Sequence, residues 1–226
     1  MTAPVLCAVA HAGGLAHGPW PMATAVLLAA LLHAGRGRRG WPAAVAFGAA
    51  GALLLALGLS MVPGYGRLPW GIVSINVGKA IGGLAAAAML PSAWHWNRRC
   101  TAIAALCLIA VPALGWAIGY LQWAPAALPA LASFAVANAF GTVAEEWFFR
   151  RWVQDPLQRF GAVAAVAGTA VLFGLAHAAM GPVFMLLATL AGSAYAAVYR
   201  ASGGSVWAAV ALHLALNVTR VALFGG

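Results

Sequence analysis

The residues of this chain that could do chemistry lie in three short clusters in its C-terminal half. They are Glu145-Glu146-Trp147-Phe148-Phe149-Arg150, Phe173-Gly174-Leu175-Ala176-His177 and His213-Leu214-Ala215-Leu216-Asn217. Each cluster interrupts an apolar stretch long enough to cross a membrane. A charged side chain at the centre of a membrane helix costs roughly 2.5–3.5 kcal/mol on insertion scales, so an intramembrane carboxylate indicates a function. The chain has only three acidic residues, and two of them are Glu145 and Glu146.

The first cluster predicts one structural glutamate and one that is available for catalysis. Side chains three or four residues apart share a helix face, so Asn138, Thr142 and Glu145 form a polar stripe. Glu146 comes four residues before Arg150, which predicts an ion pair within the helix. That pair would leave the Glu145 carboxylate free to face a cavity. An intramembrane Glu–Arg pair can also be purely structural.

The second and third clusters supply two imidazoles and an amide. His177 shares a helix face with Phe173, and His213 shares one with Asn217. Glu145 and His177 could hold and deprotonate a water molecule. His213 and Asn217 could donate hydrogen bonds to the oxyanion of a tetrahedral intermediate. The combination predicts hydrolysis, although either histidine taken alone would equally suit a packed structural residue.

The ordered motifs Glu-Glu-x-x-x-Arg, Phe-x-x-x-His and His-x-x-x-Asn resemble those of the CAAX-prenyl-protease and bacteriocin-processing family (CPBP, also called Abi). The resemblance covers residues 127–217, with each motif on its own hydrophobic span. It implies a glutamic-type intramembrane endopeptidase with an all-helical fold, a polar catalytic cavity at membrane depth, and no metal or other cofactor. Carried over, the catalytic residues are Glu145, His177, His213 and Asn217, and the supporting residues are Glu146, Arg150 and Phe173.

The composition predicts a polytopic membrane protein. Of 226 residues, 64% are hydrophobic and 7% are charged, whereas typical soluble domains carry roughly 25% charged residues. The net charge is +9, but the arginines fall between apolar runs and form no basic face, which argues against nucleic-acid binding. Lys79 is the only lysine among the twelve basic residues. This arginine bias is typical of a GC-rich bacterial genome, so we expect a multi-pass protein of the cell (inner) membrane.

We expect one membrane domain over residues 1–226, an all-α bundle of about eight transmembrane helices. Residues 127–217 would form the catalytic core, and residues 1–126 would form variable N-terminal helices. The predicted spans are about 20–35, 41–62, 70–93, 101–122, 127–154, 162–179, 182–200 and 204–224. The positive-inside rule places Arg36, Arg38 and Arg39 in the cytoplasm and both termini outside.

Two further groups of residues have less definite roles. Lys79, on the third predicted span, could line a cavity, extend to the membrane interface or pair with an acid. The cysteines are Cys7, Cys100 and Cys107. An odd number without C-x-x-C spacing predicts neither a disulfide framework nor a zinc site, so we interpret them as buried apolar residues.

The sequence leaves several functions open. A peptidase of this kind could cleave CAAX-type C-termini, mature bacteriocin-like peptides or remove C-terminal sorting anchors. Its partners would be the lipid bilayer and a peptide or membrane-anchored protein substrate, and its oligomeric state is not predicted. One alternative is a metal-dependent hydrolase, although no H-E-x-x-H motif is present. Another is a transporter or immunity protein that uses the polar cavity for binding, although no inverted repeat is apparent.

Overall fold

The chain folds almost entirely into helices, as the sequence predicts. The computed structural model describes residues 3–36, 40–71 and 73–225, so Arg38 and Arg39 lie outside the described residues. The elements in chain order are α1 (Ala3–Ala12), α2 (Trp20–Gly35), α3 (Trp41–Gly58), β1 (Arg67–Trp70), β2 (Val73–Asn76), α4 (Val77–Met89), α5 (Arg98–Ala117), α6 (Leu128–Phe148), η1 (Phe149–Gln154), α7 (Asp155–Leu157), η2 (Gln158–Phe160), α8 (Ala162–Leu175), η3 (Ala178–Met180), α9 (Pro182–Ala201) and α10 (Val206–Phe224).

Among the described residues, five helical segments are long and apolar enough to cross a membrane. They are α3, α5, the continuous segment Leu128–Phe160, α9 and α10. Each coincides with a span predicted from the sequence. The spans predicted over residues 20–35 and 162–179 correspond to α2 and α8, which are apolar helices of 16 and 14 residues. The chain is therefore a polytopic helical membrane protein.

The third predicted span, residues 70–93, is wrong in its first part. β1 and β2 form an antiparallel hairpin in which Arg67 pairs with Asn76, and α4 begins only at Val77. Hydropathy averaged over a window cannot separate this short apolar hairpin from the helix after it. A hydrogen bond between neighbouring residues sets the start of α4. The Asn76 side chain accepts a hydrogen bond of 2.9 Å from the Lys79 backbone N–H, and such N-caps start helices.

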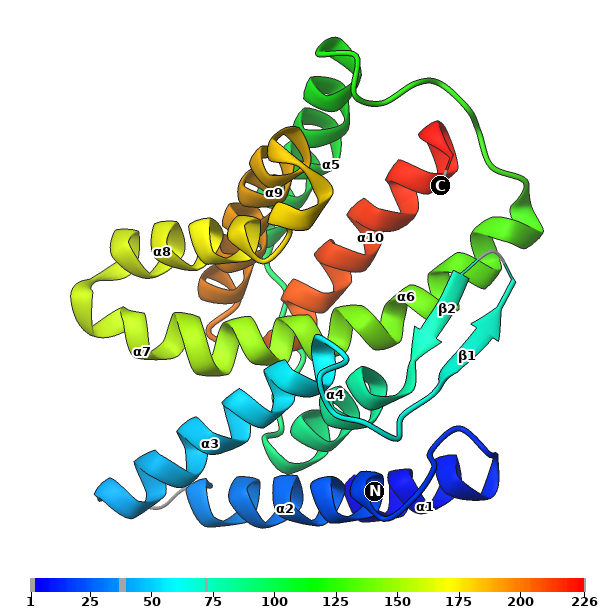
Figure 1. Ribbon diagram of the computed structural model, residues 1–226. Helices are drawn as coiled ribbons and strands as arrows, with labels where there is room; N and C mark the ends of the chain where they lie inside the picture. Colours follow the sequence, from blue (N-terminus) through cyan, green and yellow to red (C-terminus); the bar gives the residue numbers. More distant parts are fainter. Residues whose placement is uncertain (1–2, 37–39, 72, 226) are drawn as a thin grey trace. The chain divides into compact units, whose positions relative to one another are not determined.

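The described residues form two compact units. Unit 1 comprises Met1–Pro91 and Val136–Phe148, and unit 2 comprises Ser92–Ala135 and Phe149–Gly226. In unit 1, α2 packs on α3, and α4 packs on α1, α2 and α3. The pairing of α2 with α3 is visible in Figure 1. Gly82 permits the close approach of α4 to α3, since a Cβ there would lie 2.7 Å from Leu54 Cδ1.

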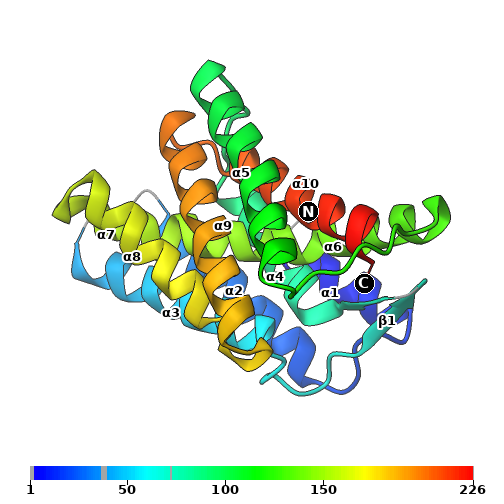
Figure 2. The ribbon, with the colours of Figure 1, turned by 90° about the horizontal axis from the view of Figure 1, so that it is seen from above.

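In unit 2, α9 packs on α5, α8 and α10. Figures 1 and 2 both show α9 running alongside α5. The closest approach of α8 to α9 is at Gly174. A Cβ there would overlap Thr189 Oγ1 and would lie 2.8 Å from the Met185 carbonyl oxygen. The Phe-Gly step of the second motif is therefore a contact point between helices.

The first motif lies where α6 changes its helical form. α6 ends at Phe148, and η1 continues the same segment as a π-helix from Phe149 to Gln154. Short π-helical turns within α-helices often occur at functional sites. Glu145 and Glu146 belong to the α-helical part in unit 1, and Arg150 belongs to the π-helical part in unit 2.

Candidate active site

Glu145 forms an ion pair that the sequence analysis did not assign to it. The Lys79 ammonium nitrogen donates to Glu145 Oε1 across 66 residues of chain. Each side chain is only about a quarter exposed, 23% for Lys79 and 24% for Glu145. The sequence predicted a Glu145 carboxylate free to face a cavity, whereas in the structure this carboxylate is paired with Lys79. Local helix spacing favoured Glu146 for pairing, whereas the cation beside Glu145 comes from a distant segment.

The approach of α4 to α6 places Lys79 at this position. A Cβ on Gly83 would lie 2.7 Å from the Ala144 Cα, so the two helices touch where Gly83 has no side chain. The lysine lies next to Gly141, since a Cβ at that position would be in van der Waals contact with Lys79 Nζ at 3.6 Å. The lysine therefore lies over the face of α6 that carries Gly141 and Glu145, one helical turn apart.

The other two residues of the predicted polar stripe, Asn138 and Thr142, are in contact on α6. The Thr142 hydroxyl donates a hydrogen bond of 3.1 Å to Asn138 Oδ1, one turn earlier on α6. Glu146 is completely buried, as is Trp147, whose indole N–H donates to the Leu90 carbonyl oxygen at 3.1 Å. Two adjacent acids thus have different environments, one buried and one partly exposed beside an ammonium group.

Arg150 is completely buried within unit 2. Its guanidinium donates to Gln154 Oε1, and the Gln154 side chain in turn donates to the Ala196 carbonyl oxygen on α9 at 2.8 Å. The arginine is therefore anchored to η1, and through Gln154 to α9. Glu146 belongs to unit 1 and Arg150 to unit 2, so the ion pair that the sequence predicts between them stays a prediction.

His177 lies just beyond the end of α8, at the start of the 3-10 turn η3. Its Nδ1 is 2.8 Å from the Phe173 carbonyl oxygen, one turn earlier. A carbonyl oxygen can only accept, so Nδ1 carries the proton and a neutral ring has an unprotonated Nε2. This tautomer is suited to accepting a proton from water.

The Phe173 ring links the second and third motifs. Its centroid is 4.8 Å from the His177 ring, 5.5 Å from the His213 ring and 4.8 Å from the Phe149 ring. His213, only 5% exposed, also stacks on Tyr195 at 4.5 Å with planes 15° apart. The two histidines of the predicted site therefore share one aromatic cluster, which we call the Phe173 cluster: Phe149, Phe173, His177, Tyr195 and His213.

A glycine on α9 makes room for this cluster. A Cβ on Gly192 would lie 3.0 Å from the Phe173 Cβ and 3.1 Å from its ring. Asn217 follows His213 by one turn of α10, as the motif spacing predicts. The structure thus brings together the predicted residues Phe173, His177 and His213 within unit 2, while Glu145 and Glu146 belong to unit 1.

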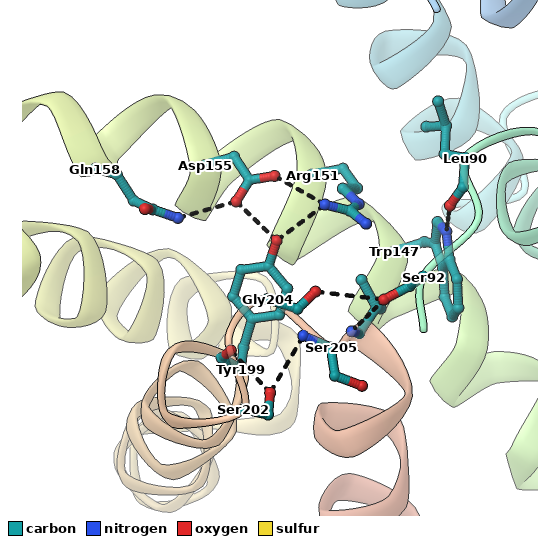
Figure 3. A network of polar contacts seen from close by, with 11 residues as sticks. Leu90, Ser92, Trp147, Arg151, Asp155, Gln158, Tyr199, Ser202, Gly204 and Ser205 are labelled. Carbon is teal, nitrogen blue, oxygen red and sulfur yellow. Dashed lines mark hydrogen bonds and ion pairs between the residues drawn. The ribbon is translucent and has the colours of Figure 1, made fainter. Parts of the chain in front are cut away.

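Sequence reasoning also missed a polar network around the third acid. Asp155 accepts hydrogen bonds from Tyr199 at 2.8 Å and Gln158 at 3.0 Å, and it pairs with Arg151 at 3.3 Å (Figure 3). The Arg151 guanidinium also donates to the Tyr199 hydroxyl at 3.1 Å. The spacing of Arg151 and Asp155, four residues apart, was a signal for their pairing. Tyr199 of this network and Tyr195 of the Phe173 cluster are also four residues apart, so they share one face of α9.

A second network in Figure 3 joins the segment before α5 to the turn between α9 and α10. Ser92 donates to the Gly204 carbonyl oxygen at 3.3 Å and accepts from the Val206 backbone N–H at 2.9 Å. Ser202 accepts from the Ser205 backbone N–H at 3.2 Å. These bonds fix the start of α10, the helix that carries His213 and Asn217.

Among the described residues, no three His, Cys, Asp or Glu side chains are grouped closely enough to hold a metal ion. All three cysteines are buried and unpaired with one another, in agreement with their interpretation as apolar residues.

Comparison with known proteins shows that the C-terminal segment is similar to a family of peptidases. The family model described as "Type II CAAX prenyl endopeptidase Rce1-like" matches residues 125–219. No curated protein and no solved structure matches the chain. The matched segment contains all three motifs and begins within two residues of the region in which the resemblance was seen. Residues 125–219 of this chain thus match a family model of type II CAAX prenyl endopeptidases, and the resemblance to the CPBP proteases is confirmed over this segment.

Proposed function

We propose that this protein is a glutamic-type intramembrane endopeptidase that hydrolyses a peptide bond in a membrane-associated substrate. The family match supports a peptidase in general. The observation that carries the finer assignment is the hydrogen bond from His177 Nδ1 to the Phe173 carbonyl oxygen, which leaves Nε2 as an acceptor. A partly exposed histidine held in this tautomer, in contact with the same Phe173 ring as the buried His213, fits acid–base catalysis better than packing alone.

In the proposed reaction, Glu145 and His177 hold a water molecule and remove a proton from it. The water oxygen forms a bond to the scissile carbonyl carbon, and the carbonyl oxygen becomes an oxyanion. His213 and Asn217 donate hydrogen bonds to that oxyanion, where preorganised donors are most effective. The proton taken from water then passes to the amide nitrogen as the C–N bond breaks. The products are a carboxylic acid and an amine, so no oxidant or other co-reactant is needed.

Glu146, Arg150 and Phe173 support this site without contacting the reacting atoms. Glu146 and Arg150 are fully buried, and a buried charge needs compensation to be tolerated. Phe173 contacts both histidine rings. The proposed substrate is a peptide or protein anchored in the bilayer, and the C-terminal CAAX-type sequence is the first class to test because it is the class in the family's name.

The test uses purified protein in liposomes with two quenched fluorescent peptides. One is prenylated and ends in a CAAX sequence, and the other carries a C-terminal hydrophobic anchor. We expect cleavage of at least one peptide by the wild type, none by Glu145→Gln, and cleavage that persists in strong chelators. Activity lost with chelators and restored by a metal would instead indicate a metal-dependent hydrolase. Solute transport without cleavage of either peptide would overturn the peptidase assignment.

A further inference from the structure

We propose that Lys79 is a positioning residue for Glu145, so that the N-terminal half of the chain completes the active site. This inference rests on the proposed function. Lys79 lies far outside residues 125–219, the segment matched by the family model. The three motifs within that segment therefore do not account for the cation beside the proposed base.

The contact is built into the packing of unit 1. Lys79 Nζ donates to Glu145 Oε1, and the helices that carry the two residues touch at Gly83 and Ala144. The lysine side chain lies beside Gly141, where a Cβ would be at contact distance, 3.6 Å, from its ammonium nitrogen. A lysine that extended to the membrane interface would need none of these features, so pairing is the role that the structure supports among those open to Lys79.

The location of Lys79 on its helix is unfavourable unless the residue has a specific partner. It occupies the first turn of α4, two residues after Val77. The helix dipole places partial positive charge at this end, which disfavours a cation there. The Asn76 side chain, which accepts from the Lys79 backbone N–H, is itself held by Ser60 at 2.7 Å. The backbone at Lys79 is thus fixed, and the ammonium group meets the carboxylate.

The pair places a compensating charge beside the proposed base. A glutamate takes a proton from water only in its negatively charged form, and the Lys79 ammonium group lies against that charge. The bond to Oε1 also restricts the orientation of the carboxyl group. A small displacement of a catalytic group can cost on the order of 10²-fold in rate. Lys79 would therefore act on turnover rather than on substrate binding.

The activity test compares Lys79→Met, Lys79→Arg and a matched control, Arg67→Met. Arg67 lies on the β1 strand of the same unit, where it donates to Ser74 at 3.2 Å. With the prenylated CAAX peptide in liposomes, we expect Lys79→Met to lower kcat about 10- to 100-fold with little change in KM. Lys79→Arg, which keeps the charge, should recover most of kcat, and Arg67→Met should behave as wild type. Unchanged or increased kcat in Lys79→Met, or a change in KM alone, would overturn the proposal.

A stability measurement separates this inference from the proposed function. Thermal unfolding of Lys79→Met, Glu145→Gln and the double variant forms a cycle in which contacting residues deviate from additivity. We expect the double variant to lose less stability than the sum of the single variants. Additive losses would overturn the pairing whether or not the peptide is cleaved. If Glu145→Gln still cleaves, the proposed function fails; if cleavage needs Glu145 but not Lys79, this inference alone fails.

Discussion

The proposed base and the proposed histidines are held by different kinds of force. Glu145 is fixed by one ion pair to a lysine 66 residues away, and both side chains keep about a quarter of their surface exposed. His213 is almost fully buried, stacks on Tyr195 and meets the Phe173 ring edge-on, and His177 is hydrogen-bonded to a backbone carbonyl oxygen. Charge attraction therefore positions Glu145, whereas ring packing and one hydrogen bond position the two histidines.

This difference predicts how each region responds to change. An ion pair acts through Coulomb attraction and tolerates small movements, so its loss alters charge and orientation more than packing. An aromatic cluster in a close-packed interior tolerates neither added nor removed volume. Substitutions at Glu145 should therefore affect chemistry in a folded protein, and substitutions around Phe173 should affect folding and chemistry together.

The largest expected effect is at Glu145. Glu145→Gln removes the proton acceptor while keeping nearly the same volume, so cleavage should fall to background in a protein that folds and expresses normally. Glu146→Gln is the matched control. Glu146 is completely buried, so its replacement should act mainly by lowering stability, because it leaves its predicted partner Arg150 uncompensated. The measurements are peptide cleavage and thermal unfolding of both variants.

The opposite pattern would exchange the roles of the two acids. Near-normal turnover in Glu145→Gln, together with none in a well-folded Glu146→Gln, would make Glu146 the base. The ion pair with Lys79 would then serve structure alone.

A smaller loss is expected from the proposed oxyanion donors. Losing one donor of this type typically costs about 10²–10³ in turnover. Asn217→Ala and His213→Ala should each lower kcat by about that factor, with a weaker effect on KM. The double variant should show less than the product of the two losses if the side chains act as a unit. A change confined to KM in Asn217→Ala would instead assign Asn217 to substrate recognition.

The sequence predicted the parts of the site that depend on local spacing. One-turn relationships placed Thr142 beside Asn138 and His177 beside Phe173, and both contacts are present. The pairing of Lys79 with Glu145 could not be predicted this way, because it depends on how α4 packs against α6. The stacking of Tyr195 on His213 depends likewise on the packing of α9 against α10.

The same limit applies to the fold. Runs of about 20 apolar residues predicted the long spans, since a membrane helix must satisfy its own backbone. The hairpin of β1 and β2 was missed because its residues Val73 and Ile75 are as apolar as those of a helix. Only the alternation of Ser74 and Asn76 with these residues hinted at strand structure.

A several-fold effect is expected from adding one methyl group next to the Phe173 cluster. Gly192→Ala would place a Cβ 3.0–3.1 Å from Phe173, and overpacking of this kind typically costs about 1–3 kcal/mol. The ring must shift, so His177 and His213 should shift with it. We expect a lower unfolding temperature and a several-fold lower kcat. The control is Gly48→Ala on α3, where a Cβ would meet nothing within 4 Å. Equal behaviour of the two variants would show that the cluster tolerates movement and does not set the histidine geometry.

The smallest effect is expected at Tyr199, one turn beyond Tyr195 on α9. Tyr199→Phe keeps the buried ring but removes the hydroxyl that donates to Asp155 and accepts from Arg151. A net hydrogen bond contributes about 1 kcal/mol, and bonds to charged groups contribute somewhat more. Thermal unfolding should therefore shift by a few degrees, while kcat and KM stay within about twofold of wild type. Tyr120→Phe is the matched control, because the exposed Tyr120 ring packs on Phe184 and should retain that contact. A large loss of kcat in Tyr199→Phe, with stability intact, would mean that the Asp155 network acts in catalysis and that aromatic packing alone does not hold the histidines in place.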